Sequence, residues 1–171
     1  MNTGDSYFWN EVYNINVNTV WGDSEPDPVI REIVLGKLKN FREKSIYVLD
    51  IGCGIGTTVF VLAEQGNLAT GWDINQWCID FARFKKKKYK LGGGFVVKKP
   101  DYSKFDFICA IDVLEHIEDL RGFLLDLGSK VETETKFYHS DWFPKSESWP
   151  LHFEEHADKL EGYLKEAGFI L

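Results

Sequence analysis

A glycine-rich turn directly after an apolar run is the part of this sequence best suited to bind a ligand. The segment from Asp50 to Gly56 has the form D-x-G-x-G-x-G, with glycine at alternate positions. Because glycine has no side chain, the backbone can turn sharply here and a ligand can approach the main chain. The run before Asp50 predicts a buried strand, and residues 57–65 predict a helix whose first N–H groups lie beside the turn. A tight strand-to-helix turn that binds nothing is the alternative.

Two common nucleotide-binding motifs do not match this turn. The dinucleotide fingerprint G-x-G-x-x-G, counted from Gly52, needs glycine where the chain has Thr57. The P-loop ends in Gly-Lys followed by Ser or Thr, and no such triplet follows the turn. The chemistry therefore has to be sought in the other residues near the turn.

An acid at the end of the next predicted strand could complete a binding site. Residues 67–72 predict this strand, and Asp73 follows it, 17 residues after Gly56. A carboxylate at this place can accept hydrogen bonds from both hydroxyls of a ribose, each worth about 1.5–3 kcal/mol. The alternative role for Asp73 is to cap the helix that begins near Gln76.

A further apolar strand, predicted over 105–111, ends in Asp112-Val113-Leu114-Glu115-His116. Together with the glycine turn and Asp73, this string resembles three motifs of the class I S-adenosylmethionine-dependent methyltransferases. The resemblance implies a three-layer, Rossmann-like α/β fold, in which helices cover both faces of an open parallel sheet. It also implies that S-adenosyl-L-methionine is the cofactor.

The resemblance assigns a part of the cofactor to each motif. The glycine turn lies against its methionine and ribose, and Asp50 helps to organise its amino group. Ile74 faces the adenine, Asp101 accepts a proton from the adenine amino group, and the main chain near Asp112 contacts the methionine end. A Pro-Asp turn is the alternative for Asp101. The predicted cofactor-binding residues are Asp50, Gly52, Cys53, Gly54, Gly56, Asp73, Ile74, Asp101, Asp112 and Val113.

His116 is the candidate catalytic residue, because an imidazole can take the proton of an acceptor hydroxyl. A loop position at the rim of the cofactor pocket is its alternative role. The acid-x-x-Glu-His string of Asp112, Glu115 and His116 is similar to a cation site in some O-methyltransferases of the superfamily, where a metal would lower the pKa of a hydroxyl. The same string occurs in members without a metal, and we expect no metal here.

Composition limits the partners and the location. The chain has 171 residues, a net charge of −7 and 44% apolar residues, which predicts one globular domain and argues against a nucleic-acid duplex as partner. The basic run at 85–90 is expected to be a solvated helix end, with an anionic-partner patch as the alternative. We find no run of 18 apolar residues and no signal-peptide pattern, so no membrane partner is expected. The three cysteines indicate reduced thiols and a cytoplasmic location.

The predicted domain covers residues 1–171, with cap helices in 1–45 and the cofactor-binding core in 46–171. Strands are expected near 46–50, 67–72, 94–98, 105–111 and 136–139, and a short sixth strand at 169–171. Helices are expected at 120–127 and 156–167. The final antiparallel strand of the family sheet is expected to be missing, because no residues of this sequence remain to form it; a naturally minimal fold, a partner that completes the sheet and a truncated chain are the alternatives.

These features predict methyl transfer to a small-molecule acceptor, at oxygen rather than nitrogen or carbon. Few catalytic side chains are needed, because the reaction depends mainly on alignment. The aromatic segment 140–153 could form a wall of the acceptor pocket or fold over the sheet edge. The alternative function is a non-catalytic module that binds the cofactor or a partner. A homodimer or a partner protein is expected to cover the C-terminal sheet edge.

Overall fold

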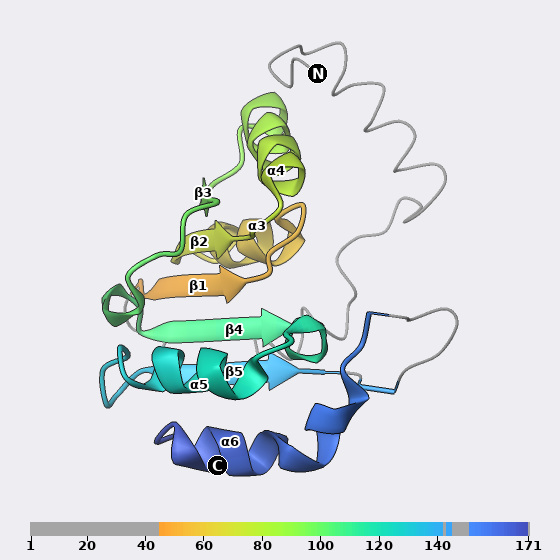
Figure 1. Ribbon diagram of the computed structural model, residues 1–171. Helices are drawn as coiled ribbons and strands as arrows, with labels where there is room; N and C mark the ends of the chain where they lie inside the picture. Colours follow the sequence, from red (N-terminus) through yellow and green to blue (C-terminus); the bar gives the residue numbers. More distant parts are fainter. Residues whose placement is uncertain (1–44, 142, 145–150, 171) are drawn as a thin grey trace.

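A five-stranded parallel sheet forms the centre of the protein. The computed structural model describes residues 45–141, 143–144 and 151–170, so most of the predicted cap region 1–45 lies outside the described residues. The strand order is β3-β2-β1-β4-β5, and all four strand pairs are parallel (Figure 1). The strands are β1 (Tyr47–Ile51), β2 (Leu68–Trp72), β3 (Gly94–Val96), β4 (Phe107–Ile111) and β5 (Lys136–Ser140). This arrangement confirms the predicted fold class.

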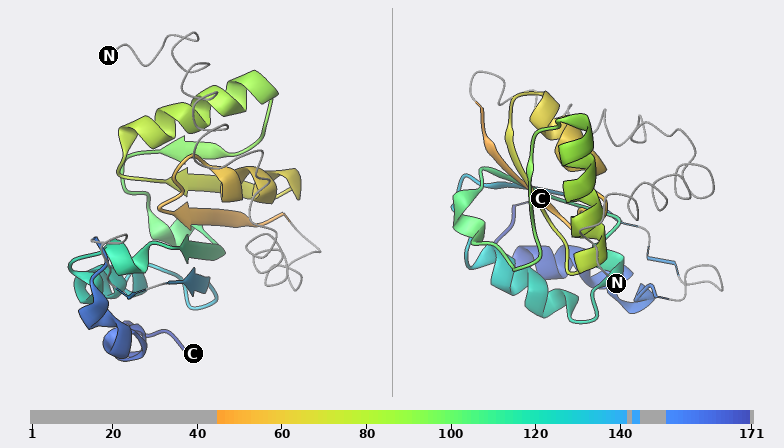
Figure 2. Two further views of the ribbon diagram at one scale, coloured as in Figure 1. Left: turned by 90° about the vertical axis from the view of Figure 1, so that its right-hand side faces the viewer. Right: turned by 90° about the horizontal axis from the view of Figure 1, so that it is seen from above.

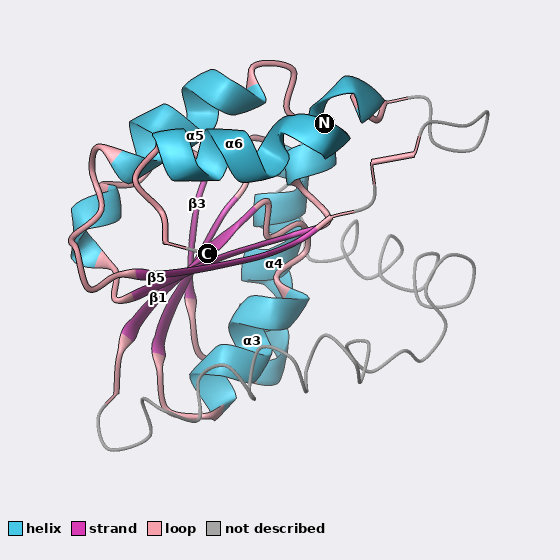
Figure 3. Ribbon diagram, turned by 90° about the horizontal axis from the view of Figure 1, so that it is seen from below, coloured by secondary structure: helices cyan, strands magenta, loops and turns pink. Residues whose placement is uncertain are grey.

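Helices cover both faces of the sheet (Figure 3). Two lie on one face, α3 (Thr57–Glu64) and α4 (Gln76–Tyr89). Two lie on the other, α5 (Leu120–Gly128) and α6 (Leu160–Glu166), and they are neighbours at the β5 end of the molecule (Figure 2). Three short 3₁₀ helices join these elements: η2 (Tyr102–Lys104), η3 (Leu114–His116) and η4 (Glu154–Lys159).

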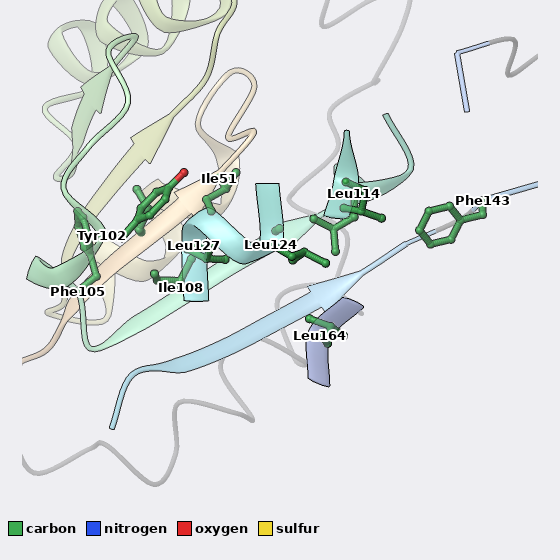
Figure 4. Packing of buried hydrophobic residues seen from close by; sticks show 12 residues of the cluster. Ile51, Tyr102, Phe105, Ile108, Leu114, Leu124, Leu127, Phe143 and Leu164 are labelled. Atoms are coloured by element: carbon green, nitrogen blue, oxygen red, sulfur yellow. The ribbon is translucent and has the colours of Figure 1, made fainter. Parts of the chain in front are cut away.

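Two apolar clusters, one on each face, hold the layers together. Val48 and Cys109 belong to the cluster beneath α3 and α4, whereas their neighbours Leu49 and Ile108 belong to the cluster beneath α5 and α6. All four side chains are fully buried. Figure 4 shows the second cluster, which extends to Phe143 beyond the end of β5. Strands buried on both faces are apolar without alternation, which explains the continuous apolar runs before Asp50 and Asp112.

The order of the strands places the predicted site at the carboxyl ends of the strands. The strands β1 and β4 are neighbours, and the chain leaves them in opposite directions, to β2 and to β5. Open α/β sheets bind ligands at this switch point, outside the carboxyl ends of the strands. The glycine turn after β1, Asp73 after β2 and η3 after β4 all lie at these ends.

Two predictions about the C-terminal part need correction. Phe169 and Ile170 form no strand. Instead the Phe169 N–H donates to the carbonyl of Leu164, and its ring packs 5.2 Å from the ring of Phe137. The helix expected at 156–167 begins as η4, and only Leu160–Glu166 is α-helical. Within the described ranges β5 is the last strand of the sheet, and the homodimer or partner at this edge stays a prediction.

The basic run at the end of α4 is used largely for contacts within the chain. The Lys85 ammonium lies 5.1 Å from the ring centre of Phe60, and Lys86 donates to the Gly93 carbonyl. Lys88 lies 5.5 Å from the ring centre of Phe84. The contacts of these three lysines agree with the expected helix-end role, in which cations are favourable near the carboxyl end of a helix. The anionic-partner alternative is not tested by them. Among the residues described, no helix has the length and apolar character to cross a membrane.

Candidate active site

The three glycines of the turn after β1 all have left-handed backbone angles, with φ of 63° at Gly52, 50° at Gly54 and 86° at Gly56. A Cβ at Gly52 would lie 2.4 Å from Val113, and one at Gly56 would lie 2.5 Å from the Phe95 ring. A Cβ at Gly54 would meet nothing within 4 Å. Two of the glycines therefore allow close packing within the fold, whereas Gly54 borders open space where a ligand can approach.

This difference predicts that Gly54→Ala impairs cofactor binding more than folding. Alanine in the left-handed region costs about 1–2 kcal/mol of stability, and its methyl group enters the open space beside the turn. We expect S-adenosylmethionine to bind at least ~10-fold more weakly, as measured by calorimetry. Gly66→Ala is the matched control, because Gly66 has a φ of 86° and open space too, but lies after α3. Equal affinity in the two variants would contradict the prediction.

Asp73 connects the ends of β1 and β2. Its Oδ2 accepts a hydrogen bond of 2.8 Å from the Gly54 N–H, and its Oδ1 accepts one of 2.7 Å from the Asn75 N–H. Each carboxylate oxygen has a second lone pair, so both can still accept a hydroxyl of a ligand. The capping role belongs to Asn75, whose side chain accepts from the Trp77 N–H at the start of α4. The ribose role of Asp73 stays a prediction.

Asp50 is a buried acid, the last residue but one of β1 before the glycines. It is 3% exposed, and the Cys109 Sγ donates to its Oδ1 over 3.4 Å. The pKa of Asp50 is raised to about 7 as the net result of three causes: burial raises it most, the hydrogen bond from Cys109 lowers it, and the negative charge of Asp73 raises it. A cationic group bound beside Asp50 would stabilise its charged form.

Other residues of the predicted cofactor set lie around the turn. The Cys53 side chain is buried against Gly71, and its N–H donates to the Trp72 carbonyl, so its thiol faces the core. Burial, and secondarily the Asp50 carboxyl, raises the pKa of Cys53. Ile74 is 85% exposed beside Asp73, as the adenine face would require. Val113 packs on Gly52, so the segment after β4 contacts the turn after β1.

The placement of Asp101 argues against its predicted cofactor role, which stays a prediction. The chain from β3 to β4 crosses the sheet to the amino-terminal ends of the strands (Figure 1). Lys99 already pairs with Asp126 in the last part of α5, and Asp101 then caps η2, which leads into β4. The Asp101 carboxylate is exposed, and it accepts from Ser103 and pairs with Lys104. We therefore propose a cofactor set without Asp101, and the alternative of a local turn describes this residue better.

The segment after β4 brings acceptor-side groups next to the turn. Asp112 has a left-handed φ of 53°, and its N–H donates to the Ser140 carbonyl at the end of β5 over 2.8 Å. A non-glycine residue in this conformation is held by its surroundings and is typical of functional sites. In η3, which follows, Glu115 is buried and His116 is exposed.

His152 joins these two residues, although it is 36 positions after His116. The ligand atoms of Glu115, His116 and His152 all lie within 4.8 Å of one another, and the two imidazole rings meet edge to face at 4.7 Å. His152 is 4% exposed, and its Nδ1 lies 3.1 Å from the Pro144 carbonyl. Spacing along the chain does not identify His152 as the histidine in this contact, because the contact depends on how the chain beyond β5 returns to η3. Part of the predicted pocket wall at 140–153 lies outside the described residues.

Two imidazoles and one carboxylate form a donor set that suits a divalent cation. The expectation of no metal was made for the string of Asp112, Glu115 and His116. The structure now places His152, a histidine further along the chain, beside Glu115 and His116. The same groups could instead take and stabilise a proton, because the carboxylate lies close to both rings.

The parallel sheet, the left-handed glycine turn and the acids at neighbouring strand ends define a Rossmann-like cofactor-binding domain. A family model described as a methyltransferase domain matches residues 28–170. The chain thus belongs to the class I S-adenosylmethionine-dependent methyltransferases, a family whose cofactor is S-adenosylmethionine. The predicted family, enzyme class and cofactor are confirmed.

Curated relatives match part of the chain. A ubiquinone biosynthesis O-methyltransferase of Pelagibacter ubique is 35% identical over 85 residues, which are 47% of this chain and 35% of the relative. One from Coxiella burnetii is 28% identical over 102 residues, 57% of this chain and 44% of the relative. The matches thus cover less than half the length of these two relatives.

Solved structures share the fold. Phosphoethanolamine N-methyltransferase 2 of Haemonchus contortus, in complex with S-adenosyl-L-methionine, has a TM-score of 0.70 and 18% identity; the match covers 99% of this chain and 43% of that one. Magnesium protoporphyrin IX methyltransferase from Synechocystis, with bound SAH, has a TM-score of 0.54 and 21% identity, and covers 74% of this chain and 66% of that one.

Proposed function

We propose that this methyltransferase transfers the methyl group of S-adenosylmethionine to an oxygen atom of a small molecule. The observation that carries the proposal is the position of η3, whose neighbour Val113 packs on Gly52 of the cofactor turn. Proton-accepting and cation-binding groups therefore lie next to the place where the methyl group would be held. The O-methyltransferase names of the curated relatives support oxygen as the acceptor atom.

Each part of the site would have its own task. Asp73 holds Gly54 and would accept from the ribose hydroxyls, and Asp50 would pair with the amino group of the cofactor. His116, at the exposed rim, would contact the acceptor and take its proton. Bound S-adenosylmethionine supplies an electrophilic methyl on a sulfonium, so the protein chiefly aligns the acceptor oxygen and removes its proton.

Release of S-adenosylhomocysteine tests the proposal. The purified chain would be incubated with S-adenosylmethionine and a panel of small phenols, alcohols, carboxylic acids, amines and thiols. We expect release with oxygen acceptors above the rate without acceptor. Binding of the cofactor without release for any acceptor would favour the non-catalytic module. In a thermal-shift assay, S-adenosylmethionine should raise the melting temperature and NAD should not, because the turn lacks the dinucleotide fingerprint.

The group of Glu115, His116 and His152 predicts a measurable affinity for a divalent cation. Cobalt(II), which shows ligand-field absorption when bound, is a suitable probe. We expect binding to weaken at least ~10-fold in His152→Gln, because one of three ligands is lost. His139→Gln is the control, because His139 pairs with Asp141 instead.

A chelator separates binding from use of the metal. Activity that survives EDTA would agree with the expected metal-free reaction, whereas activity that EDTA removes and manganese restores would make this group a metal centre. Equal cobalt affinity of His152→Gln and the unchanged chain would contradict the predicted site.

A further inference from the structure

Residues 151–156 are hydrogen-bonded to residues 115–118, which follow β4. The N–H of Phe153 donates to the Glu115 carbonyl over 2.8 Å, and the Nε2 of His156 lies 3.0 Å from the Glu118 carbonyl. A third and longer contact of 3.4 Å joins the Nδ1 of His116 to the Leu151 carbonyl. Residues 151–156 and 115–118 thus meet through contacts spaced along both segments.

His156 supplies the only side chain of its segment in these three contacts, and it is buried. Its ring is 9% exposed and lies 6.2 Å from the ring of Phe153 and 6.0 Å from that of Tyr163. Because a carbonyl only accepts hydrogen bonds, the Nε2 carries the proton and donates it to Glu118. The Nδ1 is then an acceptor that is buried without a partner. The bond to Glu118 is therefore what histidine adds over an apolar ring at this position.

The three contacts between residues 151–156 and 115–118 determine the position of His152. His152 is between Leu151, which contacts His116, and Phe153, which donates to Glu115. A shift of the segment by about 1 Å would change the edge-to-face contact of the His152 and His116 rings, and errors of this size can reduce turnover ~100-fold. None of the three contacts includes the glycine turn, Asp50 or Asp73. The acceptor side can therefore be disturbed while cofactor binding stays intact.

We propose that His156 is a positioning residue of the acceptor side, which acts through Glu118 and Phe153 to hold His152 beside Glu115 and His116. The proposal rests on the function proposed above only for its effect on turnover. The arrangement of the two rings can be measured without any acceptor.

Two variants separate the hydrogen bond from the volume of the ring. His156→Phe keeps an aromatic ring and loses the donor, whereas His156→Gln places an amide N–H near the position of Nε2. Lys159→Gln is the control, because Lys159 is exposed in the same η4. We expect His156→Phe to lower kcat roughly 10-fold or more, with the affinity for S-adenosylmethionine within about twofold of the unchanged chain. His156→Gln should recover most of the loss.

Nuclear magnetic resonance can measure the position of residues 151–156 directly. The unchanged chain should show the Nε2–H tautomer at His156, slow exchange of the Phe153 amide, and a nuclear Overhauser contact between the rings of His116 and His152. In His156→Phe the amide should exchange at least ~10-fold faster and the ring contact should weaken. In His156→Gln and Lys159→Gln both signals should be retained.

The outcomes distinguish this proposal from the proposed function. If the unchanged chain releases no S-adenosylhomocysteine, the function fails, and the resonance data alone decide the role of His156. Unchanged Phe153 exchange and ring contact in His156→Phe would overturn the positioning role. So would a parallel loss of melting temperature and cofactor affinity, because that result describes a residue needed for the whole fold.

Discussion

Replacing Asp73 by alanine is expected to weaken binding of S-adenosylmethionine by about 2–4 kcal/mol, because two charge-assisted hydrogen bonds to the ribose would be lost. This corresponds to a rise of roughly 30- to 1000-fold in the dissociation constant, measured by calorimetry. The loss has a second source, since the Asp73 carboxylate also accepts from the Gly54 N–H and so fixes the turn. Asp73→Asn keeps one oxygen acceptor, so its dissociation constant should lie between those of the unchanged chain and Asp73→Ala.

Asp119→Ala is the control for this prediction. Asp119 also accepts from a main-chain N–H, that of Gly122, but it does so at the start of α5. Its loss removes a helix cap, worth about 1 kcal/mol of stability, and should leave cofactor affinity unchanged. An unchanged dissociation constant in Asp73→Ala would reject the assignment of Asp73 to the ribose.

Replacing Asp50 by asparagine is expected to change the pH dependence of folding stability. The pKa of Asp50 rises from 3.8 to about 7 on folding, so between these values the folded chain binds a proton that the unfolded chain has released. The stability due to this group is greatest below pH 3.8 and is lost as the pH rises to about 7. Three pKa units correspond to roughly 4 kcal/mol.

Denaturant unfolding at several pH values checks this expectation. From pH 5 to pH 7 the unchanged chain should lose roughly 2 kcal/mol relative to Asp50→Asn, because other groups titrate alike in both chains. A constant difference between them would show that Asp50 is already charged at low pH. The cofactor should reverse the trend, since its cationic amino group favours charged Asp50. Binding near pH 6 should therefore release a proton, detectable by calorimetry in buffers of different ionisation heat.

Local sequence patterns were sufficient to predict the sheet but not its C-terminal end. The strands β1 and β4 are largely apolar, β2 is a mixed run, and each has an acid at or directly after its end. The glycine turn marks the start of α3. The region after β5 lacks such signals. Phe169 and Ile170 are apolar enough for a strand, but the chain after α6 leaves them against Phe137 rather than beside a neighbouring strand. Periodicity cannot distinguish these two outcomes.

Local sequence patterns likewise predict only part of the site. Asp50, Gly54 and Asp73 lie around one turn because each directly follows or ends a strand, and spacing along the chain reveals this. Asp101 also follows a strand. The structure nevertheless places it toward the amino-terminal ends of the strands, because a short connection must cross the sheet before β4 begins. His152 has no signal in its own surroundings, since only hydrogen bonds between distant segments bring it to His116.

The order of the strands also determines when this protein can fold. Val48 in β1 pairs with Phe107 in β4, 59 residues further along the chain. Closing a loop of this length costs roughly 4 kcal/mol of chain entropy, and the contact gives nothing until β4 has been synthesised. A ribosome-bound chain that ends before residue 107 would have the glycine turn and Asp73 but not the strand that covers the open side of β1. The cofactor side of the pocket thus cannot form before β4 has been synthesised, and the acceptor side must wait further, for the segment that carries His152.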